Sequence, residues 1–256
     1  MHRIRRATAG VLSGVALGGL VLTGCQSGGG ASSPSSAPAQ VTTTSPSPGL
    51  SVPGTHKSAT VYRISSPVST VVVISHVGNI TVTGGGGSSV SVTQQATWSK
   101  APPVTTRTIS GKTLTVTYTC PSQLVCAVAY AIQVPRDVAV QAQAGAGAVR
   151  LAGIAGNVTA KAKVGLIDGT GLSGASVSLT TDGGGITASF TAAPAALAAV
   201  AHVGAIILHV PGSDSYKVSA DARVGHADVG VRQSSSSDHV ITATTDVGAI
   251  KISTSA

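Results

Sequence analysis

Apolar and polar residues alternate along much of the chain after about residue 60. Residues 61–64, 71–74, 114–118 and 129–134 are rich in β-branched side chains, and Gly, Pro or Ser clusters bound them. A period of two residues is typical of β-strands, in which successive side chains point to opposite faces. The best helix candidate beyond the N-terminus, residues 192–201, contains Pro194. We therefore predict an all-β fold.

A repeat centred on one glycine is the strongest internal signal. The last six of its seven glycines are separated by 18, 19, 20, 21 and 23 residues. The seven are Gly78, Gly147, Gly165, Gly184, Gly204, Gly225 and Gly248. We interpret them as structural residues, at a bend where a Cβ atom would obstruct the neighbouring repeat.

Apolar residues recur two and four positions after each glycine, and these positions are predicted to face inward. The first set is Ile80, Val149, Ile167, Ile186, Ile206, Ala227 and Ile250, and the second is Val82, Leu151, Gly169, Ala188, Leu208, Val229 and Ile252. The residues between the two sets are predicted to face outward: Thr81, Arg150, Asp168, Thr187, Asp228 and Lys251, with Ile207 as an exception.

Each repeat also contains a second strand-like segment, such as residues 158–160, 177–179, 216–220 and 240–243. Two short strands and two turns in about twenty residues predict one coil of a β-solenoid, a β-helix-like stack that buries its apolar faces between coils. A less regular strand region precedes these coils. Ile206 is expected in the middle of this array, where Asp would disrupt the adjoining coils, and Ile250 near its end, where Asp would mainly fray the terminus.

The N-terminus has the features of a bacterial lipoprotein signal. Arg3, Arg5 and Arg6 precede an uncharged apolar run that ends in Leu22-Thr23-Gly24-Cys25. This run is shorter than the roughly 20 residues that span a bilayer. An uncleaved membrane anchor, or an ordinary signal peptide with a chance cysteine, is the alternative. We predict that Cys25 is lipidated and becomes the first mature residue.

These features divide the chain into three parts. Residues 1–24 are the predicted signal peptide, residues 25–58 the lipidated cysteine and a disordered Ser/Pro/Gly/Thr linker, and residues 59–256 the β-solenoid domain. The expected location is the outer face of the cell membrane, to which the lipid anchor attaches the chain.

The formal net charge of +8 changes the expected partners little. Without the three arginines of the signal, 13 basic residues stand against 8 acidic ones. The remaining cations, such as Lys57, Arg107, Arg136, Arg150 and Arg223, are scattered along the sequence, and aromatic residues are few. Neither a phosphate-binding groove nor a base-stacking platform is indicated, so we expect no nucleic-acid partner.

Cys120 and Cys126 are the two cysteines that follow Cys25. In an exported protein they are expected to form a disulfide. The alternative, a metal-binding pair, lacks the nearby His or Cys residues that would complete a four-ligand zinc site.

Catalytic and metal-binding motifs are poorly supported. All eight acidic residues are Asp, and they fall near turns or alternate with apolar residues. Residues 171–175 lack the last glycine of a nucleophile elbow, and residues 145–150 lack the third glycine of a dinucleotide loop. His76, His202 and His226 belong to different repeats. We expect no catalytic residues, no metal site and no cofactor.

The array as a whole resembles a bacterial domain family of unknown function, the putative adhesins. The resemblance rests on the early Gly78-Asn79-Ile80-Thr81-Val82 strand, the Val134-Pro135 step, the repeated Gly-x-Ile or Gly-x-Val strands and the lipoprotein signal. It covers about residues 60–256. It implies a β-solenoid on an exported or membrane-anchored protein, and it implies no particular ligand.

The function expected from these observations is that of a non-catalytic cell-surface lipoprotein, an adhesin or an envelope scaffold with an unknown envelope or surface partner. Two other interpretations remain open: a β-helical enzyme that processes carbohydrate or cell wall, and an accessory sensor for a membrane signalling protein. Display is favoured over catalysis because catalysis requires convergent titratable groups.

Replacement of Cys25 by Ser tests the anchor. We expect the variant to lack lipid and to leave the membrane fraction, because stable anchoring depends on the acyl chains attached at this residue. Cell fractionation and intact-mass measurement check both effects. Recovery of the cleaved variant wholly in washed membranes would contradict the prediction.

Overall fold

The computed structural model describes residues 41–44, 54–121 and 125–255. All regular secondary structure in these ranges is β-strand. Among these residues, no helix has the length and apolarity required to cross a membrane. The predicted signal peptide, Cys25 and most of the predicted linker lie outside the described residues. Two described pieces fall within that linker, β1 (Val41–Thr44) and the first residues of β2 (His56–Ile64).

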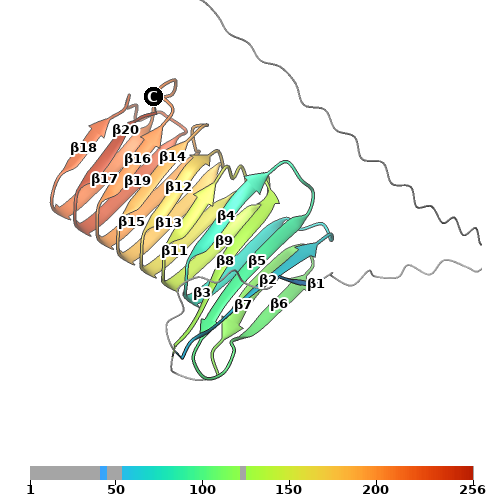
Figure 1. Cartoon of the computed structure of the whole chain (residues 1–256). Coiled ribbons are helices and arrows are strands. Elements are labelled where there is room, and N and C mark those ends of the chain that lie inside the picture. Colours follow the sequence, from blue (N-terminus) through green and yellow to red (C-terminus); the bar gives the residue numbers. More distant parts are fainter. Residues whose placement is uncertain (1–40, 45–53, 122–124, 256) are drawn as a thin grey trace, which may run out of the picture. The chain divides into compact units, whose positions relative to one another are not determined.

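The described strands form two mixed sheets that face each other across a shared core (Figure 1). One sheet has eleven strands in the order β1-β2-β5-β8-β4-β10-β12-β14-β16-β20-β18. The other has nine strands in the order β17-β19-β15-β13-β11-β9-β3-β7-β6. Each sheet runs from one edge strand to another, so neither closes into a barrel.

Antiparallel pairs build the N-terminal part of both sheets. In the eleven-stranded sheet β2 pairs with β1 and with β5 (Val90–Trp98), which pairs in turn with β8 (Cys126–Pro135). In the nine-stranded sheet β6 (Val104–Ser110) forms a hairpin with β7 (Thr113–Thr119). This is the less regular strand region predicted from the sequence.

The glycine repeats build the remainder as parallel strands. Each repeat contributes one strand to the nine-stranded sheet, turns at its glycine, and contributes the next strand to the eleven-stranded sheet. The pairs are β3 (Thr70–Val77) and β4 (Ile80–Gly85), β9 (Ala139–Ala146) and β10 (Val149–Ala152), β11 (Val158–Val164) and β12 (Ile167–Leu172), β13 (Ser176–Gly183) and β14 (Ile186–Phe190), β15 (Ala196–Val203) and β16 (Ile206–Val210), β17 (Lys217–Val224) and β18 (Ala227–Gly230), and β19 (Val240–Val247) and β20 (Ile250–Thr254).

Equivalent positions of neighbouring repeats are paired in register. Ile167 pairs with Ile186, Ile186 with Ile206, and Ile206 with Ile250. All four side chains are buried, as predicted for the position two residues after the glycine. A slip of one residue would turn this column to solvent, so burial holds the register.

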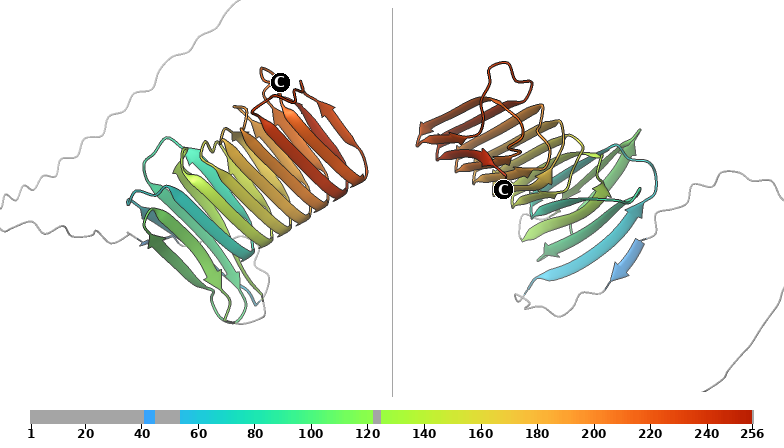
Figure 2. Two further views of the ribbon diagram at one scale, coloured as in Figure 1. Left: turned by 180° about the vertical axis from the view of Figure 1, so that it is seen from behind. Right: turned by 90° about the horizontal axis from the view of Figure 1, so that it is seen from above.

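The order of the last two repeats in space differs from their order in the chain. The C-terminal strands lie at the end of the sheets opposite β2 and β6 (Figure 2). Within that end, β20 lies between β16 and β18, and β19 lies between β15 and β17. Ile250 therefore does lie near the end, but one strand in from the edge, because the last repeat inserts between β16 and β18.

Ala227 points to the inward side, as predicted, because it pairs in register with Ile250, but it is not buried. Ala227 is exposed and Val229 is half-buried, although their paired residues Ile250 and Ile252 are fully buried. Because β18 is the edge strand, no further repeat covers the inward side of its residues.

The seven repeat glycines form one column at the turn between the sheets. All have a positive φ, from 132° at Gly78 to 152° at Gly204 and Gly248, in a region that side-chain-bearing residues rarely adopt. A Cβ atom on each would overlap a backbone carbonyl of the neighbouring strand. At Gly165, Gly184 and Gly204 that carbonyl belongs to the preceding repeat glycine.

Backbone hydrogen bonds join the turns to each other. The amide of Gly204 donates to the carbonyl of Val247 at 2.9 Å, and the amide of Ile206 donates to that of Ala249 at 2.9 Å. The same two bonds recur at Gly184 and Ile186, where the acceptors are Val203 and Ala205. The glycine turn therefore continues the hydrogen-bonded ladder from one sheet into the other.

Small side chains occupy the buried position three residues before each glycine. Alanine is found there in four repeats, and a hydroxyl residue in the others: Ser75, Thr181 and Thr245. These hydroxyls donate to the carbonyls of Val128, Gly165 and Gly204, the same carbonyls that approach the glycine column. A buried hydroxyl is tolerated here because it has a hydrogen-bond partner.

Replacement of Ile206 or Ile250 by Ala tests the spatial order of the repeats. Each side chain is 0% exposed, so each change should lower the free energy of unfolding by about 2–5 kcal/mol. Lys251→Ala, at the exposed neighbouring position, should stay within about 0.5 kcal/mol. Urea denaturation measures all three. An Ile250→Ala variant as stable as Lys251→Ala would contradict the burial of this residue between β16 and β18.

Replacement of Gly204 by Ala tests the close approach of the repeats. We expect a loss of about 2 kcal/mol or more, because the new methyl group overlaps a backbone carbonyl and the residue keeps a positive φ. Gly87→Ala is the matched control, since a Cβ atom at Gly87 has no neighbour within 4 Å. Equal melting temperatures for the two variants would contradict this role of the glycine column.

Candidate functional site

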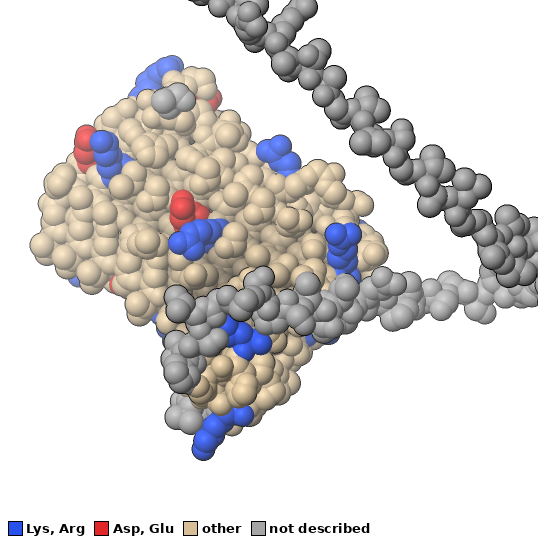
Figure 3. Space-filling view, in the orientation of Figure 1, with Lys and Arg blue, Asp and Glu red and all other residues tan. Residues whose placement is uncertain are grey.

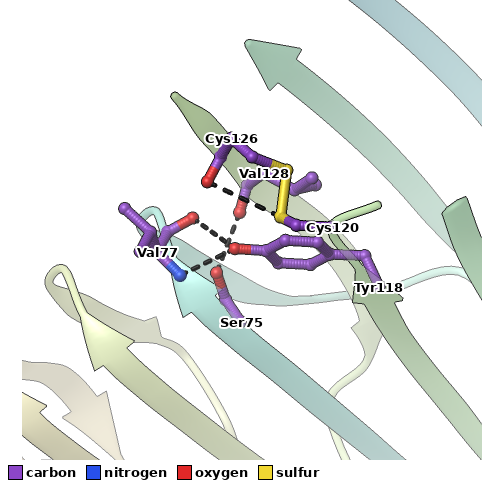
Figure 4. The surroundings of a disulfide bond; sticks show 6 residues. All are labelled: Ser75, Val77, Tyr118, Cys120, Cys126 and Val128. Carbon is purple, nitrogen blue, oxygen red and sulfur yellow. Dashed lines mark hydrogen bonds between the residues drawn. A yellow bond between two sulfur atoms is a disulfide. The ribbon is translucent and has the colours of Figure 1, made fainter. Parts of the chain in front are cut away.

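A disulfide joins the two sheets in the N-terminal part of the fold (Figure 4). Cys120 follows β7 in the nine-stranded sheet, and Cys126 is the first residue of β8 in the eleven-stranded sheet. Their Cα atoms are 6.1 Å apart. The pairing predicted from the sequence is therefore confirmed, and it links the strands on either side of residues 121–125.

Tyr118 closes the space beside this disulfide. Its hydroxyl accepts a hydrogen bond from the Val77 amide at 2.7 Å and donates to the Val77 carbonyl at 2.9 Å. Ser75 donates to the Val128 carbonyl on the other side of the same region (Figure 4). The edge of His76 meets the Tyr118 ring, with 5.5 Å between ring centroids. This cluster supports the fold and presents no free reactive group.

Two further tyrosines close the N-terminal end of the core. Burial raises the pKa of Tyr62 to about 12, and the guanidinium of Arg107 lies 4.3 Å from the centre of its ring. Burial likewise raises the pKa of Tyr130. Their hydroxyls have no hydrogen-bond partner among the described residues. Both remain protonated at neutral pH, so neither supplies a proton acceptor.

A ladder of charged residues crosses the nine-stranded sheet two positions before the repeat glycines. His202 Nδ1 donates to Asp246 Oδ2 at 2.8 Å, and His202 Nε2 lies 3.9 Å from Asp182 Oδ1. Arg223 Nη1 lies 3.4 Å from Asp246 Oδ1. Lys163 lies at the same level on β11, beside Asp182. Basic or imidazole side chains thus alternate with aspartates along the ladder.

The inserted position of β19 produces this alternation. If the repeats stacked in chain order, Arg223 would lie beside His202, and protonation of the histidine would bring two cations together. Instead Asp246 lies between Arg223 and His202. The hydrogen bond from His202, followed by the charge of Arg223, lowers the pKa of the Asp246 carboxyl. Because these side chains are largely exposed, solvent screens their interaction.

A polar hollow lies on the outer face of the eleven-stranded sheet, near the N-terminal strands. Its volume is about 400 Å³, and it opens between the ends of β2, β5, β8 and the glycine-rich segment after β4. Its lining residues are Arg63, Thr83, Gly85, Gly86, Gly87, Ser89, Ser91, Gln133 and Val134. Within this set, Arg63 is the charged residue.

A smaller hollow of about 160 Å³ continues the first along the same face. It shares Thr83, Ser91 and Gln133 with the first and adds Thr81 and Thr93. Together the two hollows present hydroxyl and amide groups with no aromatic side chain among their lining residues. We name this surface the polar face. It offers hydrogen bonds and a cation, which suits binding more than proton transfer.

The other predicted site residues are distributed through the fold. Cys25 lies outside the described residues, and the seven repeat glycines gather at the inter-sheet turn. His76 contacts Tyr118, His202 joins the charged ladder, and His226 is exposed. Within the described ranges, no group of three His, Cys, Asp or Glu side chains is placed to hold a metal ion.

Sequence reasoning missed both the charged ladder and the polar face. A signal for the ladder was present, since Lys163, Asp182, His202, Arg223 and Asp246 share one register position. Their pairing depended on the spatial order of β17 and β19. The polar face combines residues from four strands that are not consecutive in the chain, so no local motif marks it.

The fold of the described residues also occurs in solved structures. A putative cell adhesion protein from Clostridium sporogenes is 13% identical, with a TM-score of 0.50 over 78% of this chain and 100% of that one. A putative adhesin from Bacteroides fragilis is 14% identical, with a TM-score of 0.41 over 77% of this chain and 97% of that one. No family model matches the chain, and no curated protein matches its sequence significantly.

The likeness to the Clostridium sporogenes protein shows a shared fold. It confirms at that level the resemblance to the putative adhesins seen in Gly78-Asn79-Ile80-Thr81-Val82 and the later repeats. At 13% identity, it transfers neither a ligand nor a site residue.

Replacement of His202 by Ala tests the ladder. The pKa of Asp246 should rise towards the ordinary range, because the carboxylate loses its hydrogen bond. A lowered pKa stabilises the fold above the unfolded-state pKa, and this contribution is lost as pH falls through the folded-state value. Carboxyl-carbon NMR titration measures the change. His226→Ala, an exposed histidine outside these ion pairs, should leave the Asp246 pKa unaltered; an equal effect of both variants would contradict the ladder.

Proposed function

We propose that this chain is a non-catalytic, lipid-anchored bacterial surface protein whose repeats form a β-solenoid that displays an adhesive face. The observation that carries the proposal is the column of in-register repeats, whose interior is filled and whose outer faces are free to bind. The shared fold with a protein described as a cell adhesion protein agrees with this role.

The solenoid assignment rests on the path of the chain. Seven repeats each place one strand in each sheet, with parallel partners in the repeats beside them. Equivalent residues then lie about 4.8 Å apart along the stack, as they do in any β-ladder. Such a stack presents rows of side chains at regular spacing, which suits contact with an extended or repetitive partner.

The non-catalytic assignment rests on where titratable groups meet. His202, Asp182 and Asp246 come together on an exposed edge, with 57% of the His202 side chain and 60% of the Asp182 side chain accessible to solvent. The polar face contains a cation and neutral polar groups, with no carboxylate or imidazole among its lining residues. General acid–base catalysis needs an acid or base within reach of a bound substrate.

Attachment to the outer face of the membrane follows from Cys25 and the export signal before it. The sequence from residue 26 to about residue 57 is rich in Ser, Gly, Pro and Thr. Because β1 holds residues 41–44 in the sheet, the free linker would be residues 26–40, and at about 5–6 Å times the square root of the residue number it would reach on the order of 20 Å. The solenoid would then stand clear of the lipid surface.

A cell-retention assay tests adhesion. Cells that make the full chain should be retained on beads coated with envelope from the same bacterium, and cells that make Cys25→Ser should be retained much less. The released Cys25→Ser protein, added in excess, should compete with wild-type cells for the beads. We expect this competition because the soluble Cys25→Ser protein and the anchored protein carry the same binding surface.

Two results would overturn this function. Equal retention of cells with the full chain and cells without it would exclude adhesion to this envelope. Release of soluble sugars or peptides from the coated beads by the Cys25→Ser protein would identify an enzyme, because a binding protein leaves the coat intact.

A further inference from the structure

We propose that the polar face binds an acidic, carboxylate-bearing oligosaccharide, with two charged contacts: Arg63 in the face and Arg150 on β10, one strand beyond it. The proposal rests on the surface-binding function above and names the ligand class. It starts from the arrangement of outward side chains on β2, β5, β8, β4 and β10, which are neighbours in this order in the eleven-stranded sheet.

Two rows of paired residues make up the face. In the first row Arg63 pairs with Ser91, Ser91 with Gln133, and Gln133 with Thr83. In the second row Thr93 pairs with Ala131, Ala131 with Thr81, and Thr81 with Arg150. Hydroxyl and amide groups thus fill the space between two arginines.

The two arginines are separated by four strand spacings, which is roughly 20 Å at about 4.8 Å per strand. Both side chains are exposed, and neither takes part in an ion pair with the described residues. Asp168 pairs in register with Arg150 on the neighbouring strand β12, on the side of Arg150 away from the hollows, and forms no ion pair with it. Two exposed guanidinium groups at this spacing suit an extended ligand with more than one anionic group.

Charge is distributed unevenly between the two parts of the fold. Every one of the eight acidic residues lies at or after Asp137. The chain from residue 54 to residue 136 carries cations alone, and Figure 3 shows Lys and Arg without acidic neighbours over these strands on the face in view. These cations are Lys57, Arg63, Lys100, Arg107, Lys112 and Arg136. This excess of cations in the N-terminal part of the fold favours the approach of an anion.

Packing explains only part of the glycine run at residues 84–87, beside the hollow. A Cβ atom at Gly84 would overlap the carbonyl of Gly153, so the fold requires glycine there. A Cβ atom at Gly86 or Gly87 would meet no atom within 4 Å, and neither residue has a positive φ. Both residues line the hollow, so the lack of side chains at these positions leaves space beside it.

The chemistry of the lining groups favours a sugar over other anions. Hydroxyl and amide side chains both donate and accept hydrogen bonds, which matches a ligand rich in hydroxyl groups. No aromatic side chain lines the hollows, whereas proteins that bind single-stranded nucleic acid stack bases on aromatic rings. Arginine binds carboxylate through two parallel hydrogen bonds.

Isothermal titration of the detergent-solubilised full chain tests the proposal. Tetragalacturonate, an acidic oligosaccharide, should bind, and neutral maltotetraose should bind at least about tenfold more weakly, because it cannot form charge-assisted hydrogen bonds with the two arginines. Arg63→Gln and Arg150→Gln should each weaken tetragalacturonate binding by about tenfold. Lys217→Gln, which removes the same charge from β17 at the other end of the fold, should change the affinity less than twofold.

A variant that changes shape but not charge tests whether the ligand binds at a defined site or is held by general attraction between charges. Gly87→Val places a branched side chain at a residue that lines the hollow without removing a charge, and Gly87 has open space around it, so the fold should persist while binding weakens. Circular dichroism and the melting temperature check the fold of each variant.

Four results would overturn the acidic-sugar site. These are no binding of tetragalacturonate, equal binding of maltotetraose, equal losses for Arg63→Gln and Lys217→Gln, or tighter binding of a single-stranded DNA oligomer through the same arginines. If the sugar-binding tests fail while cells are still retained on the envelope beads, the acidic oligosaccharide is excluded as the ligand and the adhesive function stands. If cells that make the wild-type chain are not retained on the beads, the proposed adhesive function itself is excluded.

Discussion

In each repeat of this protein, a backbone carbonyl occupies the space that a Cβ atom would fill in the next repeat. Only glycine permits this approach, and it also permits the positive φ that turns the chain from one sheet into the other. The two requirements meet at the same residue. The turn in turn sets the register between neighbouring repeats. This register places four isoleucines in one buried column: Ile167, Ile186, Ile206 and Ile250.

Because side chains fill the interior of the fold, recognition of a partner takes place at its outer faces. Inward positions hold aliphatic side chains, or small hydroxyls that bond to the carbonyls at the turn. Alternation along a strand then directs the intervening residues to solvent. On the outer face of the eleven-stranded sheet, this brings Arg63, Ser91, Gln133 and Thr83 into one row. The row draws on strands from the antiparallel and the parallel parts of the fold, so the polar face lies where the two parts join.

Electrostatics agrees with the unusual order of the last two repeats. Backbone pairing alone would accept either order, since parallel strands of similar length present similar ladders. With β19 between β15 and β17, Asp246 contacts both His202 and Arg223. Exposed ion pairs contribute little to stability. In the alternative order Arg223 would lie beside His202 and Asp246 would lose its contact with the histidine.

The sequence by itself determined the all-β class, the inward and outward positions of most repeats, the role of the repeat glycines and the partner of Cys120. Each of these follows from local spacing: a period of two in a strand, a recurring glycine, and two cysteines close along the chain. The spatial order of β17 to β20, the exposure of Ala227, the charged ladder and the polar face were decided by the tertiary structure. They depend on which strands become neighbours, and residues 40 or more positions apart, such as His202 and Asp246, leave no local pattern that specifies their contact.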